Sequence, residues 1–314
     1  MNNYLETKHL HIQKLISEHY GFLIQNIEPA QRGFVGETFI INSVEGKSFF
    51  AKIVANTNTT NILPALFEIH QIGFEYAIYP IKTLKGKFFI PYNDRFLIVF
   101  NFIEEKSAEN VSAKDYARLV IQLHGLKGKL TTPLEAESFS ATYQDSFWDI
   151  WEKIKALRIQ SKEFQTMKTE LSDSEERIKR YWDFYHATAK TCQGLSLEFV
   201  PTHGDIPINV LRDKQGRHHL VDWDGFKMAP RERDLWNSAE KSTVIEEYLK
   251  EFPDFQINQA VCRYYTLFRY FDDLWGFLDA ILKTNEGSDI AGYSDQIIET
   301  CFRELDARIS KFIR

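Results

Sequence analysis

The sequence changes character once, between residues 101 and 105. Before this point it consists mainly of short apolar runs typical of β-strands, and after it of long stretches with helical periodicity. The change comes directly after the strand-like run RFLIVFNFI, with no linker rich in Pro or Gly. A flexible tether between independent domains would carry such a linker. We therefore expect an α+β protein with two lobes that share a cleft, residues 1–103 and 104–314.

The first lobe is predicted to mix helices and strands. Apolar residues recur at helical spacing between residues 5 and 16. A hairpin turn is expected at residues 44–47, and the run ILPALFEIHQIG predicts a helix that ends near Gly73. Strands are expected in six runs, GFLIQNIEPA, TFIINSV, KSFFAKIV, IYPIKTL, KFFIPY and RFLIVFNFI.

The second lobe is predicted to be mostly helical. Residues 111–125 carry apolar side chains on one helical face, and Ser112 with Asp115 resembles a capping box in which Asp stands for Glu. Residues from about 147 to 190 show helical periodicity with one solvated face, and further helices are predicted from residue 232 to the end. Between these stretches, the strand-like runs IPINVLRD and HHLVDWD flank a turn at Gly216.

Charge and cysteine content narrow the class of partner. The 314 residues carry a formal net charge of −6, so no overall positive field would hold DNA or RNA. Cys192, Cys262 and Cys301 form no CxxC pair, which is typical of reduced, mostly buried thiols in a cytoplasmic protein. The chain shows neither a signal peptide nor an uncharged transmembrane window. A small-molecule partner is therefore expected, without nucleic acid or membrane, and the oligomeric state stays open.

The stretch THGDIPINVLRDKQGRHHLVDWDGF carries the residues best suited to chemistry. A hairpin around Gly216 would bring Asn209 and Asp222 near each other at its open end. An amide oxygen and a carboxylate at one point can hold Mg²⁺, which leaves its other positions to water and phosphate. Asp205, on the loop just before, could then orient and deprotonate a hydroxyl. These are the groups that phosphoryl transfer needs.

Each of these residues also has a purely structural interpretation. Asp and Asn favour turns, so Asp205, Asn209 and Asp222 could be turn caps, although their joint spacing favours function. Lys52 could either extend its ammonium group into water from the edge of a strand or bind phosphate. The aromatic residues of RYYTLFRYFDDLW have the spacing of a core helix, but some could line an acceptor pocket in which Asp272 or Asp273 meets an amine.

The motifs resemble the aminoglycoside phosphotransferase family, which has the protein-kinase-like fold. The resemblance begins with HGD followed shortly by Asn and a strand that ends in DWD. The segments APRERDLW and RYYTLFRYFDDLW are similar to segments of the spectinomycin phosphotransferase branch. YARLVIQLHGL resembles the helix that follows the hinge, and FFAKI the strand with the nucleotide lysine. The resemblance covers most of the chain.

The resemblance implies a bilobal fold, with a small antiparallel N-lobe and a large, mostly helical C-lobe, and a role for each matching residue. Asp205 would be the catalytic base, and Asn209 and Asp222 would bind Mg²⁺. The groups that bind ATP, or GTP, would be Gly33, Gly36, Lys52, Phe102 and Ile103. From the residues themselves, acceptor contacts are expected from Tyr265 and Asp272, and Asp224 could contact the acceptor, lie near Mg²⁺ without binding it directly, or lie on the surface. Structural support is expected from His203 and Asp234.

The chain departs from the family pattern at two places. Asn209 comes four positions after Asp205, where the family usually has five, and one residue of extended chain spans about 3.3 Å. Either the loop takes a tighter path around Pro207, or Asn209 meets Mg²⁺ poorly. Kinase-like sites hold the nucleotide lysine with a helix glutamate, and the helix after Lys52 offers only Glu68.

The expected function is transfer of the γ-phosphate of ATP or GTP to a hydroxyl of a small molecule. An aminoglycoside or aminocyclitol is the first acceptor class, which would make this an antibiotic-resistance activity. The shortened loop supports a second hypothesis, a nucleotide-binding pseudokinase or spore-coat-like relative with weak or no transfer. A metal hydrolase that uses His203, Asp205 and Asp222 is a third hypothesis, but it would need more converging ligands than this spacing supplies.

Overall fold

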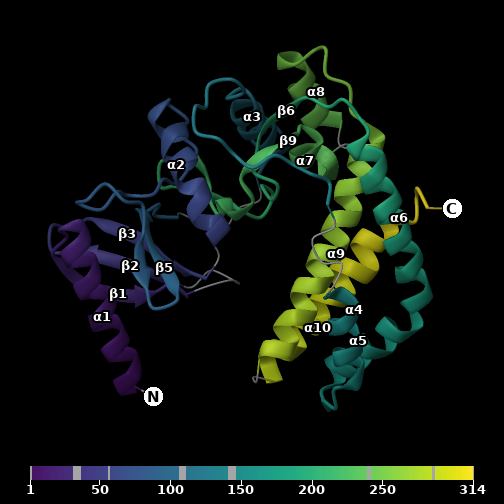
Figure 1. Ribbon diagram of the computed structural model, residues 1–314, viewed down its shortest axis with the longest axis horizontal. Helices are drawn as coiled ribbons and strands as arrows, with labels where there is room; N and C mark the ends of the chain where they lie inside the picture. Colours follow the sequence, from purple (N-terminus) through teal and green to yellow (C-terminus); the bar gives the residue numbers. More distant parts are fainter. Residues whose placement is uncertain are drawn as a thin grey trace. The chain divides into compact units, whose positions relative to one another are not determined.

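The computed structural model describes residues 2–30, 37–55, 57–105, 111–140, 146–238, 242–284 and 287–313. The chain forms two compact units, Met1–Ala136 with Phe199–Ala229, and Glu137–Glu198 with Pro230–Arg314 (Figure 1). The segment with the predicted catalytic loop therefore belongs to the same unit as the strand-rich first third of the chain. The predicted lobes, residues 1–103 and 104–314, divide the chain differently and stay a prediction.

The first unit is built around an antiparallel sheet with the strand order β1-β2-β3-β5-β4. The elements up to residue 136 are α1 Asn2–Tyr20, β1 Ile24–Pro29, β2 Glu37–Ser43, β3 Ser48–Val54, α2 Thr57–Gln71, β4 Ile90–Tyr92, β5 Arg95–Asn101 and α3 Ala113–His124. The later segment contributes β6 Phe199–Thr202, β7 Val210–Arg212, β8 His218–Leu220, a 3₁₀ turn at Trp223–Gly225 and β9 Lys227–Pro230. The antiparallel sheet that the sequence predicts is confirmed.

The helix α1 covers one face of the sheet. Ala51 and Ile53 of β3 belong to a buried cluster that also contains residues of α1. Because side chains along a strand alternate between the two faces, Lys52 lies on the opposite face. Its partners on the neighbouring strands are Thr38 of β2 and Ile98 of β5. A central strand therefore presents Lys52 on the face away from α1.

The predicted strand at residues 78–84 is wrong as a continuous element. The structure has only a single bridge there, between Pro80 and Phe100, although Ile81 N still donates to Val99 O at 2.8 Å. Proline has no N–H group, so it cannot donate to the hydrogen-bond ladder of a strand. Thr83 then closes a turn, since its N–H donates to Lys87 O at 2.8 Å.

The turn and cap that the sequence predicts are present. Ser43 N donates to Lys47 O at 2.8 Å, and Gly46 between them has a φ of +75°, which glycine adopts without strain. At the start of α3, Ser112 Oγ accepts from Asp115 N at 3.1 Å. The Ser112 hydroxyl in turn donates to the Asp115 carboxylate at 2.6 Å, so both side chains stabilise this helix end.

The hairpin of β7 and β8 carries the predicted metal-site residues at its open end. Val210 pairs with Leu220, and Arg212 with His218, as expected for a turn at Gly216. β6 and β9 form a second small pair of strands. The strand expected through residue 224 ends at Leu220, because Asp222 takes the left-handed conformation and a 3₁₀ turn follows.

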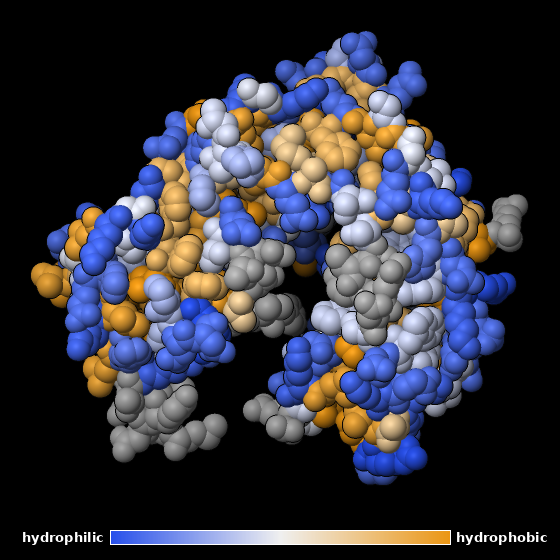
Figure 2. All heavy atoms as spheres, in the orientation of Figure 1, coloured by the Kyte–Doolittle hydropathy of each residue, from blue (hydrophilic) through white to orange (hydrophobic). Residues whose placement is uncertain are grey.

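The second unit is helical. Its elements are α4 Phe147–Ala156, α5 Lys162–Asp173, α6 Glu175–Gln193, α7 Glu232–Leu235, a 3₁₀ turn at Trp236–Ser238, α8 Ser242–Glu251, α9 Gln259–Lys283, α10 Gly287–Gln296, a π-helix at Ile297–Leu305 and α11 Asp306–Ile309. The long helix α9 packs against α4, α6 and α10. Residues 147–190 form separate helices, with Ser161 capping the start of α5. Figure 2 shows a largely hydrophilic surface along α6, as expected for a solvated helix face.

All three cysteines, Cys192, Cys262 and Cys301, are buried free thiols. Among the residues that the structure describes, every helix is too short or too polar to cross a membrane.

Candidate active site

The loop from Asp205 to Asn209 takes the tighter path around Pro207. Asn209 N donates to Ile206 O at 3.0 Å, which closes a turn with Pro207 at its second position. The fixed φ of proline suits that position. The apolar Ile206 side chain is buried and anchors the start of the turn. The loop therefore accommodates the missing residue without displacing Asn209 from the start of the β7–β8 hairpin.

The side chain of Asn209 holds Asp205. Its Nδ2 donates to the main-chain oxygen of Asp205 at 2.8 Å and to Asp205 Oδ2 at 3.1 Å. Both bonds use the nitrogen of the amide, so Oδ1 is the atom that could meet a cation. The main chain of Asn209 also lies beside that of Asp222, since Val221 N donates to Asn209 O at 3.0 Å. The structure thus brings Asp205, Asn209 and Asp222 into one neighbourhood.

Lys52 joins this neighbourhood from β3. Its Nζ lies 2.9 Å from Asp222 Oδ1 and 2.8 Å from Asp224 Oδ2. The lysine side chain is only 11% exposed, whereas those of Asp222 and Asp224 are 54% and 42% exposed. Burial alone would lower the pKa of Lys52, but attraction to Asp224 and Asp222 and the hydrogen bonds to both raise it. A charged ammonium group is therefore held between two solvent-accessible carboxylates.

A buried tryptophan fixes the turn that carries these two carboxylates. Asp222 has a φ of +58° and a ψ of +62°, a left-handed conformation that Asp tolerates better than most residues. Trp223 is 3% exposed and donates from Nε1 to Leu220 O at 2.9 Å. Its ring packs edge-on against Phe226 with ring centroids 5.0 Å apart. Because Trp223 points inward, the acids on both sides of it are left near the surface.

His203 links the two loops of the site. Its Nδ1 accepts from Asp205 N at 3.3 Å, which leaves Nε2 to donate to Val221 O at 2.9 Å. The imidazole is buried and lies against Trp223 at a centroid distance of 4.8 Å. A neutral histidine thus connects the backbone beside Asp205 to the backbone beside Asp222.

Glu68 of α2 does not pair with Lys52. Glu68 Oε1 accepts from Thr131 N at 2.7 Å and from Thr131 Oγ1 at 2.6 Å, and Oε2 accepts from Thr132 N at 2.8 Å. The hydrogen bonds from Thr131 and then Thr132 lower the pKa of Glu68 to about 2. The Glu68 carboxylate therefore connects α2 to residues 131–132, in the segment that follows α3. The contact of Lys52 with Asp224 was missed from the sequence, although two acids around an apolar residue could have suggested it.

The donor set suits a magnesium ion. Within the described ranges, no group of three or more His, Cys, Asp and Glu side chains could hold a metal. Mg²⁺ does not require such a group, because it usually takes one or two carboxylates together with phosphate and water. The Asp222 carboxylate and Asn209 Oδ1 are hard oxygen donors of this kind. These two residues would hold the ion, with Asp224 near the first.

The other predicted nucleotide contacts are only partly described. Gly33 and Gly36 lie outside the described residues. Phe102 and Ile103 follow β5 and are half-buried. Just beyond them, Glu105 forms a backbone bridge with Asp213, and the Lys214 ammonium contacts Glu104 at 2.5 Å. The segment that follows β5 therefore contacts the turn between β7 and β8.

The predicted acceptor residues Tyr265 and Asp272 lie on α9 in the second unit. Tyr265 is buried and donates to Glu137 Oε2 at 3.3 Å. Burial raises the pKa of Tyr185 on α6, and the negative charges of Glu137 and Asp272 raise it further. Asp273 instead pairs with Arg269 at 2.8 Å. Asp234 is buried in α7, and its expected bond to the catalytic loop stays a prediction.

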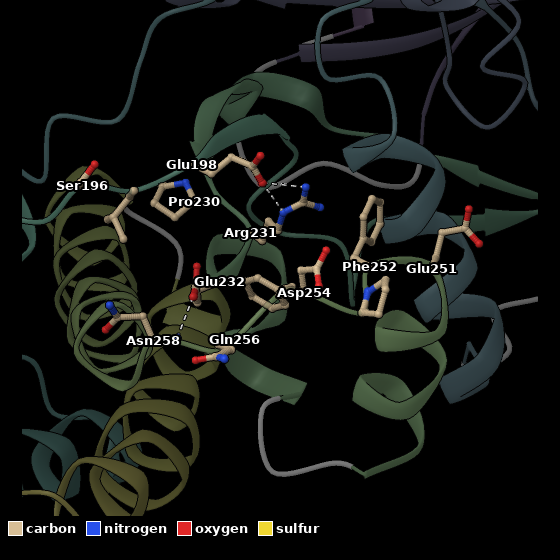
Figure 3. Close-up of a pocket in the computed structure, with 13 residues that line it drawn as sticks. Ser196, Glu198, Pro230, Arg231, Glu232, Glu251, Phe252, Asp254, Gln256 and Asn258 are labelled. Atoms are coloured by element: carbon tan, nitrogen blue, oxygen red, sulfur yellow. Dashed lines mark hydrogen bonds and ion pairs between the residues drawn. The ribbon is translucent and has the colours of Figure 1, made fainter.

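A cavity of about 610 Å³ opens in the second unit between three chain segments (Figure 3). Its wall contains Arg231, which donates to Glu198 Oε2 from Nε at 2.9 Å and to Tyr248 from Nη1 at 2.7 Å. Glu232 also lines the cavity and accepts from Asn258 N at 2.8 Å, and burial raises its pKa. None of the described residues that line it is a predicted site residue.

No protein-family model and no curated protein sequence matches this chain. Solved structures do resemble it. Spectinomycin phosphotransferase APH(9)-Ia, in complex with ADP and spectinomycin, aligns with a TM-score of 0.73 at 21% identity, over 92% of this chain and 94% of that chain. A microcompartment-associated aminopropanol kinase aligns with a TM-score of 0.62 at 13% identity, over 96% and 98% of the two chains.

An aminoglycoside phosphotransferase from Alicyclobacillus acidocaldarius aligns with a TM-score of 0.57 at 15% identity, over 95% of this chain and 96% of that one. At such identities a likeness shows the fold alone. The α+β kinase-like fold expected from the motifs is confirmed, together with the resemblance to aminoglycoside phosphotransferases at the level of fold.

Proposed function

We propose that this chain is a small-molecule kinase that transfers the γ-phosphate of ATP, or GTP, to a hydroxyl group. The observation that carries the proposal is the cluster in the first unit. Asn209 Nδ2 lies 3.1 Å from Asp205 Oδ2, and Lys52 Nζ lies 2.9 Å from Asp222 Oδ1. A carboxylate for the nucleophile, a hard-oxygen pair for a cation and a lysine for phosphate are the parts that phosphoryl transfer uses.

Each residue of the cluster would have a defined role in this reaction. Asp205 would accept the proton of the acceptor hydroxyl and orient its oxygen. Asn209 would hold the Asp205 carboxylate through Nδ2, and its Oδ1 and the Asp222 carboxylate would bind Mg²⁺. When bound, the ion would neutralise charge on the phosphates. Lys52 would contact phosphate oxygens.

The remaining predicted residues would position the substrates. His203 would keep the two loops in register through its bonds to Asp205 N and Val221 O. Main-chain groups of Phe102 and Ile103 would bind the purine, and the turn with Gly33 and Gly36 would lie near the phosphates. These roles follow from the resemblance of the motifs and from the hinge segment next to the β7–β8 turn.

An aminocyclitol or aminoglycoside is the first acceptor class to test. Solved structures with this fold include a phosphotransferase with bound spectinomycin, an aminopropanol kinase and a choline kinase, all named for acceptors with an amino or a quaternary ammonium group. In the second unit, Tyr265 and Asp272 are proposed to contact such an acceptor, with Glu137 nearby. Phosphorylation of an antibiotic of this class would make the activity one of resistance.

The test is an Mg²⁺-dependent transfer assay with mass detection of the product. The purified chain is incubated with ATP or GTP and a panel of aminocyclitols, aminoglycosides and amino alcohols, beside Asp205→Ala. A phosphorylated acceptor that is absent with Asp205→Ala supports the proposal. Tight nucleotide binding without transfer to any acceptor would support the pseudokinase instead. Phosphate release from simple esters without nucleotide would support a metal hydrolase.

A further inference from the structure

In kinase-like sites a helix glutamate holds the nucleotide lysine. In this chain the corresponding helix does not supply the partner of Lys52. Glu68 is the only acidic residue of α2, and donors from Thr131 and Thr132 occupy both of its oxygens. A carboxylate that accepts these bonds at 2.7 and 2.8 Å is committed to the segment after α3. Lys52 must therefore be held by another group.

Lys52 contacts two acids at nearly equal distances. Asp224 Oδ2 lies 2.8 Å from Nζ, and Asp222 Oδ1 lies 2.9 Å from it. The two acids occupy different places in the turn. Asp222 is the left-handed residue at the end of the β7–β8 hairpin, whereas Asp224 lies inside the 3₁₀ turn that Trp223 anchors.

We propose that Asp224 is the positioning residue for Lys52 in this chain, in place of the helix glutamate of kinase-like sites. The proposal rests on the proposed function for the nucleotide that Lys52 would bind. It replaces the acceptor contact considered for Asp224 from the sequence. Asp222 can then give up its contact with Lys52 to a cation, while Asp224 keeps the ammonium group in place.

In this arrangement the position of the Lys52 ammonium group does not depend on the position of α2. In a site where a helix glutamate holds the lysine, a shift of that helix can break the pair. Here α2 is fastened through Glu68, and Lys52 is held by the turn that also carries Asp222. The lysine and the metal carboxylate would therefore keep their relative positions whatever α2 does.

The first experiment measures how well Lys52 is held in the absence of any nucleotide. The intact protein receives a short pulse of an isotope-coded acylating reagent, and labelling of Lys52 is quantified by mass spectrometry. Contacts with Asp224 and Asp222 shield the Lys52 ammonium group from the reagent, so Asp224→Asn should raise the labelling rate about fivefold, the factor that loss of one typical hydrogen bond gives. Asp224→Glu should restore most of the protection, and Glu68→Gln should label within about twofold of the wild type.

The second experiment measures turnover once an acceptor is known. Asp224→Asn should lower kcat about tenfold, with partial recovery in Asp224→Glu, whereas Glu68→Gln should change kcat less than twofold. Wild-type labelling in Asp224→Asn, or equal labelling in Glu68→Gln and Asp224→Asn, would overturn the proposal. Because labelling needs no nucleotide, a chain without kinase activity would refute the proposed function and still allow the Lys52 contact to be judged.

Discussion

Two carboxylates at opposite ends of the β7–β8 hairpin, Asp213 at its turn and Asp222 at its open end, lie in opposite chemical situations. Asp213 is 7% exposed and accepts from Gln215 N, Arg217 N, Arg217 Nε and His219 Nε2 at 2.8–3.0 Å. All these donors come from its own hairpin. Asp222 is 54% exposed, and its ion pair with Lys52 joins β3 to the turn after β8, which lies far along the chain.

The difference separates a carboxylate that holds the fold from one that can act. A buried acid with local donors on both oxygens cannot exchange a partner without loss of stability. An exposed acid that shares one lysine with a second acid can turn to a metal ion at little cost. Asp213, before β8, therefore has a structural role, whereas Asp222, after β8, is suited to ligand binding.

The largest expected effect comes from the acid that we propose as the base. Asp205→Asn keeps the shape of the side chain, and its amide can still interact with Asn209, but it cannot accept a proton. We expect kcat to fall about 10³-fold, as for loss of a general base. Nucleotide affinity, measured by calorimetry, should stay within about twofold. Loss of both together would mean that Asp205 supports the structure and does not act as a base.

The next largest effect is a difference in stability between matched variants of Asp213 and Asp222. Asp213→Asn should lower the free energy of unfolding by about 3 kcal/mol, because it removes a buried charge from a hydrogen-bonded network. Asp222→Asn should change it by less than about 1 kcal/mol, because the side chain is solvent-accessible. Urea unfolding of both variants measures this difference. The opposite order would contradict the assignment of Asp213 to structure and Asp222 to function.

The smallest expected effect is a change in acid stability. Hydrogen bonds from Thr131 and Thr132 lower the pKa of Glu68 to about 2, against about 4.3 in an unfolded chain. This stabilisation is fully present above the unfolded pKa and is lost as the pH falls from there towards 2. Glu68→Gln should therefore flatten the dependence of the Tm on pH between about 4.5 and 2. Identical slopes in the variant and the wild type would show that Glu68 does not fasten α2.

Local features of the fold could be predicted from the sequence because local chemistry determines them. The turn at Gly216 and the pairing of Val210 with Leu220 follow from a polar turn between two apolar runs. The Ser112 cap follows from the residue types at the start of a helix. The strand through Pro80 failed for an equally local reason, since proline cannot donate to the ladder.

The partners of the site residues could not be predicted, because tertiary packing decides them. Whether the loop would bend at Pro207 depended on one backbone bond, from Asn209 N to Ile206 O. The partner of Lys52 depended on which donors surround Glu68, and these lie on a segment far along the chain. No spacing in the sequence encodes either contact, whereas the positions of Asp205, Asn209 and Asp222 do follow from the motif.

The most direct test is a crystal structure of the protein with Mg²⁺ and a non-hydrolysable ATP analogue. We predict one ion bound by Asn209 Oδ1 and the Asp222 carboxylate, with the terminal phosphate facing Asp205. Lys52 should contact phosphate and remain beside Asp224. An ordered nucleotide whose metal avoids both oxygens, or an Asn209 and Asp222 too far apart to share an ion, would contradict the proposed site.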